Sequence, residues 1–207
     1  MNRDYWQSVL EREEQARGYH EGFKLLFCPW HLIETADTVF LSLNPGSDPS
    51  GEYMRIASDE RGNSYLVRRE AKHSPIAEQY RRLCDFIERD PETVLAGALM
   101  PFRTSNWLRS RDRTNISVSR PFWQKAFTCG RVHQVFCMGR EVENEVVALT
   151  GAAIEREVPA NWGKLSIRRY RAENGLLVYG LLHFSTYKMF SRPECVSALQ
   201  GLLDSSR

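Results

Sequence analysis

Two short polar motifs stand where two apolar runs of the sequence end. The letters NPGS at 44–47 follow the run at 39–43, and HFS at 183–185 follows the run at 176–182. A glycine at 46 permits a positive φ and a close approach of the backbone to a ligand, which a structural tight turn also requires. The amide of Asn44 and the imidazole of His183 are the candidate groups for chemistry.

A basic stretch in the middle of the chain is the second candidate feature. Residues 61–140 contain 15 Lys and Arg against 7 Asp and Glu, although the formal net charge of the whole chain is only +2. From Arg103 to Lys125, six basic residues and one acid are mixed with three aromatic residues. A polyanion such as nucleic acid is attracted to such a surface. A solvated, Arg-rich loop is the alternative interpretation.

Four buried strands are predicted to carry these motifs. Each is a short run of apolar and β-branched residues without polar alternation, which is typical of strands covered on both faces. A shorter extra strand over 165–171 is predicted to turn back into the last of the four. The four main segments are Thr38–Asn44, Thr93–Met100, Val132–Gly139 and Leu176–His183.

Helical patterns lie between these strands. Apolar residues recur at helical spacing after Ser74-Pro75 and again after the third strand. The sequence at 191–194 has the form of a capping box that begins a last helix. Residues 3–16 are predicted to form an N-terminal helix with four side chains inward, namely Tyr5, Trp6, Val9 and Leu10.

Strands that alternate with helices predict an α/β fold. We expect a three-layer α/β/α sandwich with a four-stranded, mainly parallel central sheet, in a single domain over residues 1–207. The ligand site of such a sheet lies beyond the carboxyl ends of its strands. Asn44 and His183 both follow predicted strands, so we expect their side chains to converge on one cleft at that edge.

The order of these motifs resembles the uracil-DNA glycosylase superfamily over roughly residues 38–190. The NPG at 44–46 looks like the Gly-x-Asn-Pro-Gly motif of the mismatch-specific and single-strand-selective branches, and HFS looks like a degraded His-Pro-Ser motif. The resemblance implies a monofunctional DNA glycosylase that uses no cofactor. Such an enzyme flips a base out of DNA and hydrolyses its N-glycosidic bond, leaving an abasic site.

By that resemblance, Asn44 would position the attacking water with its amide carbonyl. His183 would donate a hydrogen bond to the pyrimidine O2 as negative charge accumulates there, and one such donor contributes about 3 to 4 kcal/mol to transition-state stabilisation. Tyr187 would be a wedge that fills the emptied base stack, with packing against the last helix as its alternative role. The other expected substrate contacts are Pro45, Gly46, Ser47, Phe102, Arg103 and Ser185, and the expected DNA contacts are Arg109, Arg111, Arg113 and Lys188.

Two departures from the family pattern bear on the substrate. Many relatives read uracil with an Asn on the second strand, whereas Ala96–Met100 holds no amide side chain and its small residues leave room for a bulkier base. Phe184 replaces the proline of the second motif. We therefore expect a modified or damaged pyrimidine rather than plain uracil. Hypermodified phage DNA would be such a substrate, and the activity would then serve in anti-phage defence as well as in repair.

Composition excludes several protein classes. The 207 residues are 42% hydrophobic and 26% charged, which excludes disordered and collagenous chains. No run of 18 apolar residues and no signal-peptide pattern is present, so we expect a cytoplasmic monomer that does not contact membranes. The five cysteines are never spaced as C-x-x-C, and no metal site is predicted.

Two alternatives to a glycosylase stay open. A catalytically inert nucleic-acid binder on the same fold would trap a flipped or single-stranded base without turnover. A small-molecule hydrolase is the second alternative, because fold does not determine function. Such an enzyme has no need of the basic stretch from Arg103 to Lys125.

Overall fold

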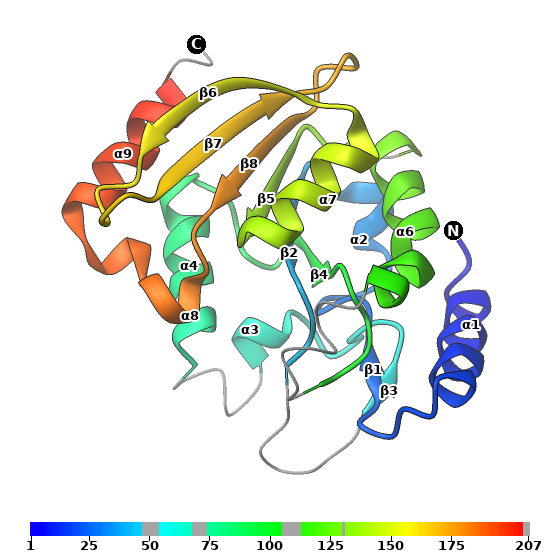
Figure 1. Ribbon diagram of the computed structural model, residues 1–207. Helices are drawn as coiled ribbons and strands as arrows, with labels where there is room; N and C mark the ends of the chain where they lie inside the picture. Colours follow the sequence, from blue (N-terminus) through cyan, green and yellow to red (C-terminus); the bar gives the residue numbers. More distant parts are fainter. Residues whose placement is uncertain (47–53, 68–73, 105–112, 130, 205–207) are drawn as a thin grey trace.

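The computed structural model describes residues 1–46, 54–67, 74–104, 113–129 and 131–204. These residues form a central sheet of six strands in the order β4-β2-β5-β8-β7-β6, with helices on both faces (Figure 1). The first four strands of that order are parallel to one another, as the sequence predicts. The strands are β2 (Thr38–Ser42), β4 (Leu95–Ala98), β5 (Gln134–Met138), β6 (Ala153–Pro159), β7 (Ser166–Arg171) and β8 (Leu177–Leu181).

The predicted number of four strands is wrong, because β7 and β6 extend the sheet beyond β8 with antiparallel pairing. β7 is the predicted extra strand. β6 escapes prediction because all seven of its residues are exposed or half-buried and three successive residues, 155–157, are charged. The four parallel strands are buried along nearly their whole length, which is why their sequences are continuous apolar runs.

One face of the sheet is covered by four helices whose inward side chains form a single core cluster. Leu10, Trp123 and Val146 are fully buried members of this cluster. Trp6 and Leu10 point inward as predicted, whereas Tyr5 is 62% exposed, contrary to prediction. The helices are α1 (Arg3–Ala16), α2 (Leu32–Thr35), α6 (Arg113–Cys129) and α7 (Arg140–Thr150).

The opposite face is covered by the remaining helices (Figure 1). Tyr80, Phe184 and Leu199 form its core together with apolar side chains of β2, β4, β5 and β8. The elements are α3 (Ser64–Val67), α4 (Pro75–Phe86), α8 (Phe184–Tyr187), the 3-10 helix η2 (Met189–Ser191) and α9 (Pro193–Leu203).

The two predicted helix starts have different outcomes. Ser74 is the N-cap of α4, and its side chain accepts a hydrogen bond from the Ala77 N–H. The predicted capping box at 191–194 is wrong, because Arg192 is the N-cap of α9 and makes no side-chain capping bond. Pro193 then begins that helix, since its fixed φ suits the first helical position.

The outer edge of β4 is closed by residues 23–27, which run antiparallel to it through bridges from Phe23 to Phe102 and from Leu26 to Gly97. A Cβ at Gly97 would lie 2.7 Å from the Leu25 carbonyl oxygen and 2.8 Å from the Trp123 ring, so only glycine fits there. Within the same segment, β1 (Phe23–Lys24) pairs in parallel with β3 (Arg55–Ile56). Residues 54–67 of the long insertion are thereby attached to the sheet. Among the described residues, no helix is long and apolar enough to cross a membrane.

Candidate functional site

Asn44 and His183 lie at the same carboxyl edge of the sheet, which confirms that part of the prediction. Leu41 of β2 is in register with Cys137 of β5, which is in register with Gly180 of β8. Asn44 and His183 each stand three residues beyond these aligned positions. β5 alone lies between β2 and β8, so these two strands are about 10 Å apart at the aligned positions. Convergence of the two side chains on one cleft stays a prediction.

The strand order places this edge at a topological switch point. From β2 the chain crosses to β4 on one side, and then returns past β2 to β5 on the other side. In open parallel sheets, ligands bind in the crevice beyond the strand ends where the order reverses in this way. Here that crevice lies beyond β2 and β5, between the motif that begins at Asn44 and the start of α7 at Arg140.

The loops that follow β2 and β4 are joined by two hydrogen bonds. The Asn44 amide nitrogen donates to the Thr104 carbonyl oxygen at 3.3 Å. Arg103 Nη1 donates to the Gly46 carbonyl oxygen at 3.4 Å. Gly46 has φ +72°, so the motif needs its glycine for the turn itself. The bond to Thr104 commits the nitrogen end of the Asn44 amide and turns its oxygen, Oδ1, away from that loop.

Phe102 and Arg103 are not available as substrate contacts in this structure, contrary to expectation. Phe102 is 1% exposed and packs edge-on against the ring of Tyr19, and Arg103 is 4% exposed. The cavity beside them is about 10 Å³, which is at the lower limit for one water and far too small for a base. Arg103 instead supports the motif loop through its bond to Gly46.

The segment Ala96–Met100 does not form the roomy wall expected from its small side chains. Ala96, Ala98 and Met100 are fully buried. Residues 23–27 cover the edge of β4, and the Trp123 indole donates to the Ala98 carbonyl oxygen at 3.0 Å. Small residues are therefore needed at these positions for close packing within the core.

His183 lies two residues beyond the end of β8 and is the N-cap of α8. Its Nδ1 lies 2.9 Å from the hydroxyl oxygen of Ser185, so the two residues of the second motif are in direct contact. Burial lowers the pKa of His183 below its ordinary value, and the Glu141 carboxylate at the start of α7 opposes that shift. The imidazole is therefore neutral at pH 7. When the Ser185 hydroxyl donates to Nδ1, the ring proton is on Nε2.

Gly139, between β5 and α7, lies beside His183 and has a backbone conformation that favours glycine. This residue has φ +96° at the N-cap of α7, and its N–H donates to the Leu181 carbonyl oxygen at 3.0 Å. A Cβ at Gly139 would lie 3.7 Å from His183 Cδ2. A side chain would therefore fit in the space beside the imidazole, but the positive φ of Gly139 is one that side chains rarely adopt.

The remaining candidates next to His183 are on the surface. Ser185 and Lys188 are exposed, whereas Tyr187 is half-buried with its ring edge-on to Trp162 at 5.6 Å between centroids. Tyr187 thus packs on a residue of the loop between β6 and β7, and its role as a wedge stays a prediction. Lys188 has φ +45°, an unusual backbone conformation for a side chain other than glycine.

Part of the expected DNA-binding stretch can be placed. Arg113 is the first residue of α6, and its side chain is outside the described part of the chain, as are Ser47, Arg109 and Arg111 altogether. Two aromatic residues of the stretch, Phe122 and Trp123, are fully buried and cannot stack on bases. Arg120 forms an ion pair with Glu145 of α7. The described half of the stretch is therefore mainly a helix that packs on the sheet.

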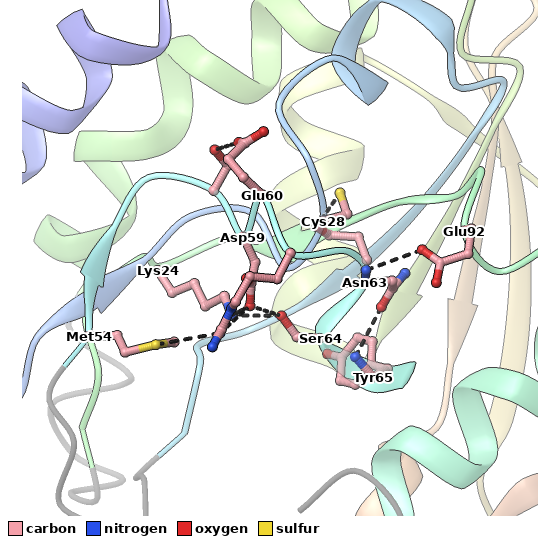
Figure 2. A network of polar contacts seen from close by, with 12 residues as sticks. Lys24, Cys28, Met54, Asp59, Glu60, Asn63, Ser64, Tyr65 and Glu92 are labelled. Carbon is pink, nitrogen blue, oxygen red and sulfur yellow. Dashed lines mark hydrogen bonds and ion pairs between the residues drawn. The ribbon is translucent and has the colours of Figure 1, made fainter. Parts of the chain in front are cut away.

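A polar cluster that sequence reasoning missed lies beside the outer edge of β4, between residues 23–27 and the insertion (Figure 2). Lys24 Nζ donates to Asp59 Oδ2 and to the Ser64 hydroxyl, both at 2.6 Å, and Ser64 donates to Asp59 at 2.9 Å. Arg61 adds bonds to both carboxylate oxygens of Asp59. Lys24 and Asp59 are each 1% exposed. We call Lys24, Asp59 and Ser64 the buried network.

The buried network holds the insertion against the sheet. Burial alone would raise the pKa of Asp59, but the bonds from Arg61 and Lys24 outweigh it and hold that pKa well below its usual range. Nearby, the side chain of Asn63 donates to the Tyr80 hydroxyl at 2.8 Å, and its backbone N–H donates to Glu92 (Figure 2). The sequence offers no signal for the network, because Lys24 is 35 residues from Asp59 and 40 residues from Ser64 along the chain.

No group of three or more His, Cys, Asp or Glu side chains among the described residues is placed to hold a metal ion. Comparison of the sequence with models of known protein families and with curated proteins finds no match.

Proposed function

We propose that this protein is a monofunctional DNA glycosylase that hydrolyses the N-glycosidic bond of a modified or damaged pyrimidine. The observation that carries the proposal is the pair formed by Asn44 and His183 at the switch-point edge of the sheet, each bonded on one side only to the protein's own groups. We call Asn44 and His183 the edge pair. The sequence resemblance supports the same activity.

Each member of the edge pair has one group left for a substrate. With its nitrogen bonded to Thr104, Asn44 can present Oδ1 to a water. With Nδ1 bonded to Ser185, the neutral His183 can donate from Nε2 to the O2 of a flipped pyrimidine. A neutral imidazole is a suitable donor because its N–H stabilises the developing negative charge through a hydrogen bond.

The reaction needs little proton abstraction from the protein. As the bond from the sugar carbon to the base breaks, the sugar becomes positive and the base takes the bonding electron pair. The water held by Asn44 then bonds to that carbon and releases a proton, which neutralises the departing base. An amide is a poor base, so this site depends on a good leaving group. The hydrogen bond from His183 to O2 makes the base a better leaving group. The products are the free base and an abasic site.

The substrate class rests on the second strand. Where the resemblance places an Asn that reads uracil, Ala96–Met100 supplies no amide, and because the segment is packed in the core it contributes neither hydrogen bonds nor a wall to the site. A site without matched hydrogen bonds discriminates only modestly among bases, so plain uracil is expected to be a poor substrate. Hypermodified pyrimidines of phage DNA belong to the expected class, with defence as the corresponding role.

The test is incubation of the protein with a panel of oligonucleotides, each holding one modified base, followed by alkali to cleave abasic sites. We expect cleavage at one or more modified pyrimidines, weaker cleavage at uracil, and loss of cleavage with Asn44→Ala. His31→Ala is the control, because His31 is exposed at the start of α2, which precedes β2 at the amino edge of the sheet. Binding without cleavage of any member would favour an inert binder, and efficient cleavage at uracil alone would contradict the substrate class.

A further inference from the structure

The antiparallel hairpin of β6 and β7 brings an aromatic ring to the same edge as His183. Arg168 of β7 is in register with Gly180 of β8, so the loop at 160–165 lies next to the residues that follow β8. Trp162 in this loop is half-buried and meets the ring of Tyr187 edge-on. The Asn161 side chain donates to the Glu194 carbonyl oxygen at 3.0 Å, which fixes the loop to the start of α9.

Trp162 holds the side chain of Arg192. The guanidinium carbon lies 3.2 Å from the Trp162 ring centroid, so the cation is stacked on the face of the indole. Stacking uses the flat face of a guanidinium and leaves its N–H donors directed outward from its rim. Arg192 itself is exposed. The ring therefore fixes the orientation of a cation whose donors face solvent.

Arg192 differs in this respect from most arginines of the protein. Arg55, Arg61 and Arg171, among others, form ion pairs with carboxylates. Among the described residues, Arg192 forms neither an ion pair nor a side-chain hydrogen bond, and the same holds for the exposed Lys188 and Lys164 close to it in the chain or the loop. Glu194 is the exposed acid of this region. The surface formed by Lys164, Lys188, Arg192 and Glu194 is thus net positive, and its cationic side chains have hydrogen-bond donors that can bind a ligand.

The backbone around this surface is also unusual. Asn161 and Lys188 are two of the three described residues other than glycine with a positive φ. Such conformations cost free energy and persist where the surrounding structure fixes them, frequently at binding sites. Here they flank a contact in which Trp162 is packed on both Tyr187 and Arg192.

We propose that Trp162, Lys188 and Arg192 form a phosphate clamp for the DNA strand next to the flipped nucleotide. Arg192 binds a phosphodiester with the rim of its guanidinium, Lys188 adds a second charge, and Trp162 positions Arg192 without touching DNA. The Arg192 guanidinium is held in one orientation and has no carboxylate partner among the described residues. Its paired N–H donors suit two oxygens of a phosphate ligand. The inference rests on the proposed function for the identity of the anion as DNA.

The test measures the Kd of a labelled oligonucleotide at several KCl concentrations. We expect Arg192→Gln to weaken binding several-fold and to reduce the slope of log affinity against log salt by about 0.7 to 0.9, because one phosphate contact is lost. Trp162→Leu keeps the charge, so affinity falls while the slope changes less. Arg12→Gln is the matched control, since Arg12 is exposed on α1 and its loss should change neither quantity. Melting curves check that each variant is folded.

The outcomes separate this proposal from the proposed function. Equal affinity and slope for Arg192→Gln, Arg12→Gln and the unaltered protein, or absence of DNA binding by the unaltered protein, would overturn the clamp. Competition by polyglutamate as strong as that by DNA would assign an acidic polypeptide and also overturn it. If Arg192→Gln loses affinity and salt slope while no base in the panel is excised, the clamp stands and the glycosylase proposal fails.

Discussion

The edge pair lies beyond the carboxyl ends of β2 and β8, whereas the buried network lies beside the outer edge of β4, and the two differ in how their bonds are used. Each member of the edge pair is half-buried and bonded on one side, Asn44 to Thr104 and His183 to Ser185. In the buried network, Lys24 bonds to both Asp59 and Ser64, and little of either charged side chain reaches water. A polar group next to the sheet is therefore not a candidate site by its position alone. What distinguishes the edge pair is that its groups can still form hydrogen bonds and can be reached from solvent.

The largest effect is expected in the buried network. Lys24→Met leaves the buried carboxylate of Asp59 without its closest partner, and loss of one member of a buried ion pair costs about 3 to 5 kcal/mol of folding free energy. Urea unfolding measures this change. The double variant Lys24→Met with Asp59→Leu should recover much of the loss, because no charge then stays buried. Equal stability of the single variant and the unaltered protein would contradict the role of the network.

The corresponding change in the edge pair should affect catalysis instead. His183→Ala removes the proposed donor to O2, and we expect excision to fall by about 10²-fold to 10³-fold. Unfolding free energy should change far less than in Lys24→Met. His31→Ala again serves as the control. Excision at the original rate by His183→Ala would remove His183 from the mechanism.

pH should separate the two regions. Because burial lowers the pKa of His183, the neutral form persists below pH 6.5. Protonation of Nδ1 ends its acceptance of the Ser185 hydroxyl and so disturbs the orientation of the ring, and we expect excision to fall only as pH falls through that lowered pKa. The low pKa of Asp59 contributes stability that is present above the unfolded pKa of about 3.9 and is lost as pH falls further. Excision rates and urea unfolding, both measured across pH, check that excision is lost at a higher pH than stability. Loss of stability at a higher pH than loss of excision would contradict the prediction.

The smallest effects on stability and excision are expected when serine is replaced by alanine, once in each region. Ser64→Ala removes a hydroxyl bonded to Lys24 and Asp59, which should cost about 1 to 3 kcal/mol of stability with excision unchanged. Ser185→Ala removes the partner of His183 Nδ1 on an exposed residue. We expect it to lower excision several-fold with little change in stability. Similar behaviour of the two variants in both assays would erase the distinction between the regions.

The sequence predicts the parallel half of the fold well for a physical reason. Strands such as β2 and β5 are buried on both faces, so burial alone selects their residues. Asn44 and His183 follow from that prediction, because the end of each strand is visible in the sequence. β6 is exposed and charged, and α6 contains Pro121, so neither shows the pattern of its class.

Tertiary packing accounts for the candidates that the sequence misassigns. Phe102 and Arg103 follow a strand as functional residues do, but the segment at 23–27 covers the edge of β4, and both residues lie in the core. The buried network and the stack of Trp162 on Arg192 join segments far apart in the chain. Spacing along the sequence carries no information about such contacts.

The exposed strand β6 bears on how the protein resists aggregation. An outer strand of a sheet can pair with the same strand of another molecule and so begin an ordered aggregate. The middle of β6 carries the charges of Glu155, Arg156 and Glu157, and its last residue, Pro159, has no N–H to donate. Arg171 and Arg168 of β7 bind Glu155 and Glu157 within the molecule. A second molecule that paired here would have to dehydrate this row of charges, which opposes growth of such an aggregate.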